Sequence, residues 1–406
     1  MTLFGRRNYV LLVCFFAIFA GFSVRYSYGL LLPQMLPALS ISKAEAGLIF
    51  SSFFIAYTAF SPIVGVLADE ISIRKVLVTF LILLGCGSTL MAFASSLKLA
   101  ILFFGLAGIG ASSCWSPVVP LAQRWIGDAR KGMVFAVITS GGAFGTMVSS
   151  LVMPILVENY SWRSGWVFLG ALAFALAFAC AIVPIDRPDM GIGVKSKKGH
   201  IFSIRDAFIG RFRDPKFWLI GGSYMLVVFA VLIPFTFLVT YAVQEFGHPY
   251  KDAARLISVI AIASIIGRFL LSSLSDYLGR IKVLIFSCIL IVFGILGMIY
   301  QQSYDQLRLF AFIFGCGHGS LWPLYATCAS DYFPKDYTGS ILGAWTLLGG
   351  ICSIACPVIV GYLVDYTETF AWSFILGAVV AGTSIILLFP LVFRSKSWLT
   401  DSARSC

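Results

Sequence analysis

Two arginines within long apolar stretches are the residues of this chain best placed for chemistry. Arg25 falls inside the stretch 9–36 and Arg268 inside 253–275. A lone charge at the centre of a membrane helix costs ~2.5–3.5 kcal/mol on insertion scales, so a compensating group is expected. None of the 18 acidic residues lies midway along an apolar stretch. Since a guanidinium offers a planar fork that matches a carboxylate, the pattern indicates a binding site for an anion.

Each arginine also has a structural interpretation that the sequence leaves open. Arg25 could bind backbone carbonyls or an external loop, and Arg268 could be tied to Asp276, which lies two helical turns further along. Of the two, we expect Arg268 to be the main anion-binding residue, with Arg25 assisting or guiding entry.

His318 is the one histidine inside an apolar stretch, within Gly315-Cys-Gly-His-Gly319. Imidazole takes up a proton near pH 6–7, so His318 is a candidate for proton coupling or for donating a hydrogen bond to a substrate. A neutral, hydrogen-bonded core histidine is the alternative. Aromatic residues with polar tips could line the same cavity or simply pack the helices. These candidates are Tyr28, Trp115, Tyr224, Trp322 and Tyr325.

The composition excludes a soluble protein. The 406 residues are 59% hydrophobic and only 12% charged, whereas globular chains carry about 25% charged residues. The chain is too apolar to be disordered and too long for a small disulfide scaffold. Cys352 and Cys356 are four residues apart, but no further soft ligand accompanies them, so we expect neither a metal nor another cofactor.

Twelve apolar stretches are long enough, or nearly so, to cross a ~30 Å hydrocarbon core as helices. They are 9–36, 45–68, 76–95, 99–123, 132–157, 164–184, 217–242, 253–275, 283–300, 309–330, 340–364 and 371–393. The first continues past Arg25 and is followed by eleven more, so we interpret it as a signal anchor rather than a cleaved signal peptide. The fold class expected is therefore an all-α membrane protein embedded in a lipid bilayer.

The basic residues predict the orientation. Of the 29, 21 lie in the segments that share a side with the N-terminus, six lie on the opposite side, and the other two are Arg25 and Arg268. Cytoplasmic segments carry the excess of Lys and Arg, which places both termini in the cytoplasm of a multi-pass inner (plasma) membrane protein. The net charge of +11 is thus topological, and no nucleic-acid partner is expected.

The chain repeats itself at an offset of 207 residues. The matched pairs are Glu45 with Asp252, Asp69 with Asp276, Lys75 with Lys282, Gly110 with Gly317, Trp115 with Trp322, Trp125 with Tyr332, Gly132 with Gly339 and Glu158 with Asp365. We expect two six-helix halves, 1–184 and 217–406, joined by a central cytoplasmic loop at 185–216. Repeated halves with a substrate site between them are typical of secondary transporters, although a duplicated membrane protein without a transport role is the alternative.

A motif after the second stretch identifies the family that the chain resembles. Gly65-Val-Leu-Ala-Asp-Glu-Ile-Ser-Ile-Arg-Lys75 returns after the eighth stretch as Ser272-Ser-Leu-Ser-Asp-Tyr-Leu-Gly-Arg-Ile-Lys282. This duplicated pattern resembles the major facilitator superfamily over essentially the whole chain. The resemblance implies a cytoplasmic latch in which carboxylate and basic groups pair across the inner face. Its members here would be Asp69, Arg74, Lys75, Asp276 and Arg280, which could otherwise be simple positive-inside anchors.

A shorter resemblance narrows the substrate. An arginine in the eighth stretch and the run Val24-Arg-Tyr-Ser-Tyr-Gly29 in the first look like the oxalate/formate antiporter and monocarboxylate porter branch. Oxalate exchangers carry a second cation in the eleventh span, whereas residues 339–364 of this chain contain none. The pattern therefore favours a monocarboxylate over a dicarboxylate.

Other residue types argue against other cargoes. A mid-depth carboxylate, which cation and drug exporters use, is missing, and Phe104 stands where their pattern has an arginine. Two asparagines, Asn8 and Asn159, are too few for a sugar site, and no phosphate-binding loop supports ATP-driven transport. Nor is there a cluster of residues suited to an enzyme. We expect a monomeric alternating-access carrier of a small organic anion, working by proton symport or anion exchange. The alternatives are an exporter of larger amphipathic compounds and a non-transporting membrane sensor.

Overall fold

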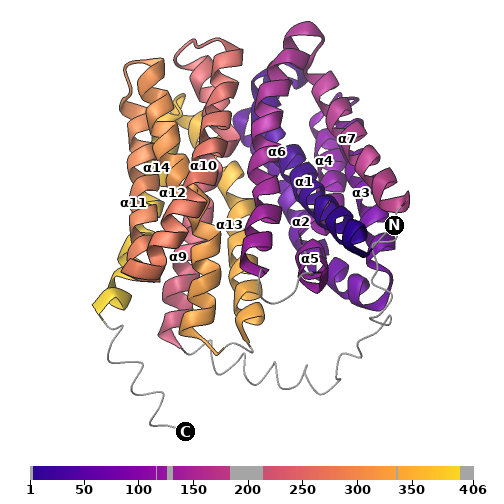
Figure 1. The fold of residues 1–406 in the computed structure, drawn as a ribbon. Helices are drawn as coiled ribbons and strands as arrows, with labels where there is room; N and C mark the ends of the chain where they lie inside the picture. The colour runs from indigo at the N-terminus through magenta and orange to yellow at the C-terminus, as the bar shows by residue number, and fades with distance from the viewer. Residues whose placement is uncertain (1–2, 116, 126–130, 183–213, 335–336, 394–406) are drawn as a thin grey trace. The chain divides into compact units, whose positions relative to one another are not determined.

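The structure is a computed structural model that describes residues 3–115, 117–125, 131–182, 214–334 and 337–393. Within these ranges the chain forms α-helices and one short 3-10 helix, and no strand (Figure 1). In the first part of the chain the helices are α1 Leu3–Leu39, α2 Lys43–Glu70, α3 Ile73–Met91, α4 Leu97–Ala111, η1 Ser112–Cys114, α5 Val118–Trp125, α6 Lys131–Asn159 and α7 Trp162–Ile182. After these come α9 Pro215–Gln244, α10 Tyr250–Leu278, α11 Arg280–Tyr300, α12 Tyr304–Tyr332, α13 Thr338–Thr367 and α14 Ala371–Phe393. The predicted all-α class is confirmed.

Eleven of the described helices are long and apolar enough to cross a membrane. The tenth predicted stretch, α12, is a 29-residue helix with mixed polar and apolar residues, and it is not among those eleven. Each of the other predicted stretches coincides with one of the candidate spans, because long runs of apolar residues satisfy their backbone polar groups only as helices in such an environment.

The fourth predicted stretch, 99–123, is not one continuous helix. It is divided into α4, η1 and α5. The hydroxyls of Ser112 and Ser113 donate to the carbonyls of Ile109 and Gly110 at 2.6 and 3.0 Å, in competition with the helical backbone pattern. Pro117, which immediately precedes α5, has no N–H to continue the ladder of α4. The interruption lies beside Trp115, one of the predicted site residues.

The described helices cluster into two compact units. The first contains α1 to α7 together with the segments Phe235–Ala261 and Pro357–Glu368. The second contains α9 up to Pro234, then Ile262–Cys356 and α14. This grouping follows contacts rather than chain order, because the two segments pack on helices of the first unit. The predicted halves, 1–184 and 217–406, stay a prediction, and most of the loop 185–216 lies outside the described residues.

Small residues and one carboxylate hold the first unit together. A Cβ atom at Gly141 or Gly145 of α6 would overlap a backbone carbonyl of α1, so glycine permits the close approach of these helices. At the start of α2, the Asp365 carboxylate accepts hydrogen bonds from the backbone N–H groups of Lys43 at 3.0 Å and Ala44 at 2.8 Å. These N–H groups have no partner within their own helix, so Asp365 supplies one.

In the second unit, α10 and α12 are in direct backbone contact. A Cβ atom at Gly267 would overlap the carbonyl of Cys316, and one at Gly319 would overlap the carbonyl of Ser264. The helices therefore cross at these glycines, with α11 packed against both α12 and α14. This crossing sets the register of the residues beside it, which include Arg268 and His318.

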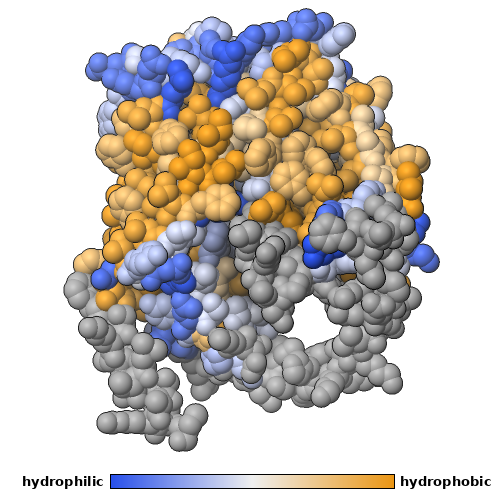
Figure 2. Space-filling model, in the orientation of Figure 1, coloured by the Kyte–Doolittle hydropathy of each residue, from blue (hydrophilic) through white to orange (hydrophobic). Residues whose placement is uncertain are grey.

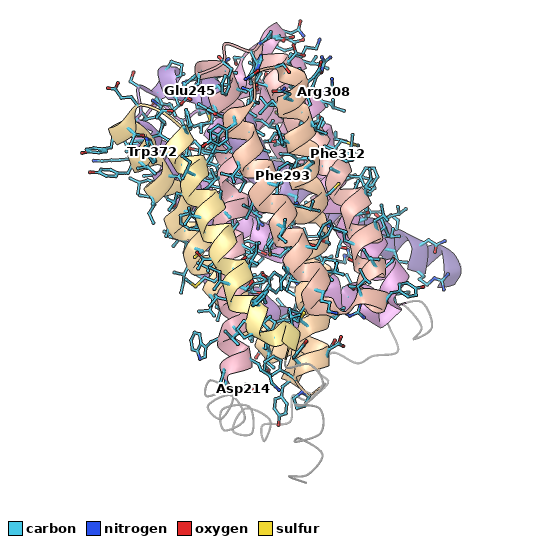
Figure 3. The ribbon with its side chains drawn as sticks, turned by 90° about the vertical axis from the view of Figure 1, so that its left-hand side faces the viewer. Asp214, Glu245, Phe293, Arg308, Phe312 and Trp372 are labelled. Atoms are coloured by element: carbon cyan, nitrogen blue, oxygen red, sulfur yellow. The ribbon has the colours of Figure 1, made fainter. Side chains whose placement is uncertain are left out.

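The outward surface of the second unit is apolar between charged ends. Phe293 of α11 and Phe312 of α12 project outward with 55% and 37% exposure, and Arg308 and Asp214 lie toward opposite ends (Figure 3). The space-filling view likewise shows predominantly apolar side chains on the exposed helix faces (Figure 2). Exposed apolar patches of this kind indicate an environment other than water, here the lipid bilayer.

Candidate functional site

Arg25 lies inside a cage of aromatic rings. Its guanidinium carbon is over the rings of Phe22 at 5.1 Å, Phe53 at 5.6 Å, Phe54 at 5.1 Å and Tyr57 at 4.6 Å from the ring centroids. Phe22 precedes Arg25 by three residues on α1, and the other three rings come from α2. We call these four rings the aromatic cage. Each provides a negative ring face to the cation, an interaction worth ~0.5–2 kcal/mol depending on desolvation.

No acidic residue in the described part of the chain forms an ion pair with Arg25. Its Nε atom is buried without a hydrogen-bond partner there, and the side chain interacts with neighbouring Tyr26, which stacks on Phe235 at 4.3 Å. One interpretation of the sequence is that Arg25 donates hydrogen bonds to backbone carbonyls. No such hydrogen bond occurs among the described residues. Ring faces therefore stabilise the charge of Arg25 where an acidic residue would otherwise do so.

Trp115 adjoins the aromatic cage. Its ring is 6.4 Å from that of Phe22, and the side chain is half-buried at the interruption between α4 and α5. The structure thus brings together two of the predicted residues, Trp115 and Arg25, around one shared neighbour.

Tyr28, by contrast, lies in a separate stack of rings. It is fully buried, its hydroxyl donates to the carbonyl of Ala46 at 2.6 Å, and its ring stacks on Phe50 and Phe104 at 5.1 and 5.0 Å. Because its polar tip is already used within the core, this geometry favours the packing interpretation of Tyr28. Its contact with a substrate stays a prediction.

Arg268, Ser264 and His318 form a polar cluster in the second unit. Arg268 and Ser264 are four residues apart on α10, so their side chains share one face of the helix. The Ser264 hydroxyl is 2.9 Å from Nδ1 of His318 on α12, and Arg268 is close enough to His318 for an electrostatic interaction. His318 is only 7% exposed, whereas Arg268 is half-buried. The backbone crossing at Gly267 explains why these residues meet.

Three of the predicted aromatic residues extend from this cluster. Trp322 meets His318 nearly at right angles with centroids 6.0 Å apart. Tyr224 of α9 contacts Trp322 at 5.6 Å and Tyr325 at 5.0 Å. Tyr325 is 1% exposed and its hydroxyl is 2.7 Å from that of Ser223. Of these three aromatic residues, Trp322 is thus nearest to the polar cluster. Tyr325 is the most deeply buried, with its hydroxyl paired within the core.

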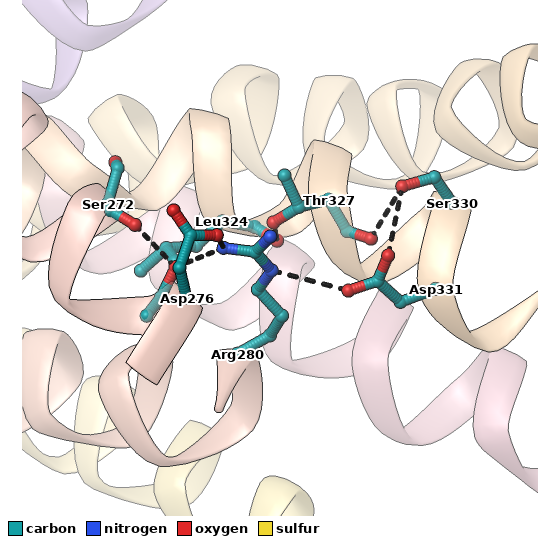
Figure 4. Close-up of polar contacts among 8 residues, drawn as sticks. Ser272, Asp276, Arg280, Leu324, Thr327, Ser330 and Asp331 are labelled. Atoms are coloured by element: carbon teal, nitrogen blue, oxygen red, sulfur yellow. Dashed lines mark hydrogen bonds and ion pairs between the residues drawn. The ribbon is translucent and has the colours of Figure 1, made fainter. Parts of the chain in front are cut away.

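Arg280 is the centre of a polar cluster at one end of the second unit. Its Nη1 atom is 2.5 Å from the carboxylate of Asp276 and donates to the Ser275 hydroxyl at 2.6 Å, while its Nε donates to Asp331 at 3.2 Å (Figure 4). Asp276, the residue that could have tied Arg268, forms its ion pair with Arg280. Asp276 thus has a basic partner on α11, and the binding of an anion by Arg268 stays a prediction.

The matching residues of the first unit make other contacts. An Nη atom of Arg74 donates to the carbonyl of Ala181 at 2.5 Å, and the backbone N–H of Lys75 is capped by the Ser72 hydroxyl. The side chain of Asp69 lies outside the described part of the chain. Pairing of these groups across the two halves stays a prediction.

Sequence reasoning missed the aromatic cage and the partner of His318. Aromatic residues within apolar stretches are usually core residues, so nothing in the sequence distinguishes Phe53, Phe54 and Tyr57 from ordinary packing. Their spacing does place them near one face of a helix. Ser264 precedes Arg268 by one turn, but its contact with His318 depends on the register of two helices.

Comparison with known proteins assigns the fold to a family. The family model described as Major Facilitator Superfamily matches residues 11–355 and 256–404. The chain belongs to this superfamily. The superfamily resemblance of the duplicated motif is thereby confirmed, and with it a multi-pass membrane protein that is a transporter rather than an enzyme.

Named relatives of the superfamily are similar to this chain over most of its length. Monocarboxylate transporter 12-B of Danio rerio is 26% identical, over 82% of this chain and 75% of that protein. The probable sulfoacetate transporter SauU of Cupriavidus necator is 21% identical, over 94% and 92%. Among solved structures, a bacterial homologue of the human lysosomal transporter Spinster superposes with a TM-score of 0.81 at 15% identity, covering 98% of both chains. That likeness supports the superfamily fold alone.

Proposed function

We propose that this protein carries a small organic anion, specifically a monocarboxylate, across a membrane by alternating access. The proposal rests on the surroundings of the Arg25 guanidinium. Ring faces from α1 and α2 surround it, and it has no acidic partner among the described residues. A carboxylate from the cargo would supply the charge that the chain does not. Relatives named as monocarboxylate and sulfoacetate transporters support an anionic cargo.

In this proposal Arg268 is the main binding residue for the carboxylate. Its half-buried guanidinium shares a helix face with Ser264, beside the imidazole of His318. A bidentate contact of guanidinium with carboxylate is short and charge-assisted, and it fixes the orientation of the anion. Arg268 binds the carboxylate, and Arg25 assists or guides its entry.

The driving force is a proton or anion gradient. The acidic residues of the described helices lie near helix ends, as Glu45 and Asp252 do in the first turns of α2 and α10. Proton symport would therefore use His318, the substrate itself or a chain of water molecules, whereas anion exchange needs no titrating residue. Both termini are cytoplasmic and the membrane is the plasma membrane in this proposal, in line with the distribution of basic residues.

Export of a larger amphipathic anion is the second candidate. Aromatic side chains around Arg25 and beside His318 favour it, because both residues lie against rings. A series of straight-chain carboxylates of increasing length separates the two. Uptake that is highest for the shortest acids supports the small-anion proposal, and uptake that is highest for the longest acids supports the amphipathic one.

A thermal-unfolding screen of the purified protein tests the cargo class. A ligand that binds the folded state raises stability according to its concentration relative to its dissociation constant, by about 2.7 kcal/mol at a hundredfold excess. We expect stabilisation by acetate, propionate or butyrate, and none by glucose, tetraethylammonium or the amide propionamide. Stabilisation by the amide equal to that by the acid would contradict an anion site.

A further inference from the structure

We infer that the aromatic cage around Arg25 makes this carrier selective for monocarboxylates with an apolar body, alkyl or aryl, over hydroxylated acids and dicarboxylates. The inference rests on the proposed function and adds the substrate class to it. It depends on the walls of the site rather than on the cation.

The walls of the cage are almost entirely carbon. Four ring faces lie within 5.6 Å of the Arg25 guanidinium carbon, and Tyr57 contributes the single hydroxyl among these rings. The neighbouring Tyr26 is already engaged by Arg25 and stacked on Phe235. Gln34, the first side-chain amide after Arg25 on α1, is nine residues away, about 13.5 Å along the helix axis.

The residues of the cage differ in exposure. Phe53 is 0% and Phe54 5% exposed, so these rings are buried, whereas Phe22, Arg25 and Tyr57 keep partial exposure. In this inference, an entering anion approaches the guanidinium from the side of the partly exposed rings, Phe22 and Tyr57. During entry its carboxylate pairs with the Arg25 guanidinium, and the rest of the molecule lies against ring carbon.

The aromatic cage favours an anion with an apolar body over one with a polar body. An apolar body gains from leaving water for the rings. A hydroxyl or second carboxylate loses its hydration, and the rings offer only the Tyr57 hydroxyl in return. An apolar wall rejects an added hydroxyl by up to about 100-fold, so we expect a preference of about tenfold or more for the unsubstituted acid.

The test compares two acids that differ by one hydroxyl, phenylacetate and mandelate, as competing radiolabelled substrates in liposomes containing the full chain. We expect the wild-type protein to take up phenylacetate at least about tenfold faster than mandelate at equal, subsaturating concentrations. Tyr57→Gln places an amide in the cage and should bring the ratio toward one. Tyr57→Phe keeps the ring and should keep or sharpen the preference.

Two further variants serve as controls for this test. Tyr160→Gln makes the same kind of change at a side chain that is 79% exposed, and it should leave the ratio unchanged. Phe22→Gln repeats the amide on α1 in case Tyr57→Gln does not fold, as judged by thermal unfolding. Equal uptake of both acids by the wild type, or an unchanged ratio in the amide variants, overturns the inference and leaves the proposed function standing. Failure to take up any carboxylate overturns both.

Discussion

The hydroxyl of Ser264 lies 2.9 Å from Nδ1 of His318, one helical turn from Arg268 on the same face of α10. This contact links the one histidine found within an apolar stretch to the helix face that also carries Arg268. Ser264, His318 and Arg268 are therefore coupled, because a movement of the imidazole would change the surroundings of the guanidinium.

Ser264→Ala should impair transport more than it impairs folding. The change leaves a buried imidazole nitrogen without its hydroxyl partner, at a cost of about 1–3 kcal/mol. Ser287→Ala is the matched control, since that buried hydroxyl bonds Val283 and Ser320 of the same unit and lies outside the proposed site. We expect similar losses of thermal stability, but a several-fold lower carboxylate uptake only for Ser264→Ala. Equal uptake by the two variants would show that Ser264 has no positioning role.

Gly267→Ala should destabilise the protein through the crossing of α10 and α12. The added Cβ overlaps the backbone carbonyl of Cys316, which cannot rotate away as a side chain would. Overpacking of this kind costs about 1–3 kcal/mol. Gly382→Ala in α14 meets no atom within 4 Å and should be neutral or slightly stabilising. Thermal unfolding in detergent distinguishes the two, and an unchanged midpoint for Gly267→Ala would show that this crossing is looser than described.

Arg280→Gln should cost little stability. Its partners Asp276 and Asp331 are 59% and 49% exposed, so each ion pair contributes about 0.2–1 kcal/mol. Arg308→Gln removes a comparable exposed pair with Asp305 and serves as the control. A latch role for Arg280 predicts slower transport in Arg280→Gln with nearly normal unfolding, and normal transport in Arg308→Gln. If both variants transport at wild-type rates, Arg280 is only a local tie.

The sequence contained the charges of the site but not their surroundings. Arg25 and Arg268 are conspicuous because a charge is rare in an apolar stretch, and the helices follow from the length of those stretches. The aromatic cage is not conspicuous, since Phe53 and Phe54 look like ordinary core residues until α1 and α2 are placed together.

Local exceptions were equally hidden. The interruption of the fourth stretch depends on Ser112 and Ser113 bonding back to α4, and small polar residues are common enough in membrane helices that their presence alone predicts no break. The burial of Tyr28 depends on Ala46 accepting its hydroxyl, a contact between different helices. Composition and periodicity carry no information about such contacts.

Arg268→Lys is the most direct test of an anion held by a guanidinium. Lysine keeps the charge but loses the planar fork, so the geometry of a bidentate carboxylate contact cannot be reproduced. We predict that uptake of a monocarboxylate into liposomes falls at least about tenfold, the equivalent of about 1.4 kcal/mol, with normal thermal unfolding. Arg308→Lys, which is outside the proposed site, should transport normally. Wild-type uptake by a folded Arg268→Lys protein would contradict the account.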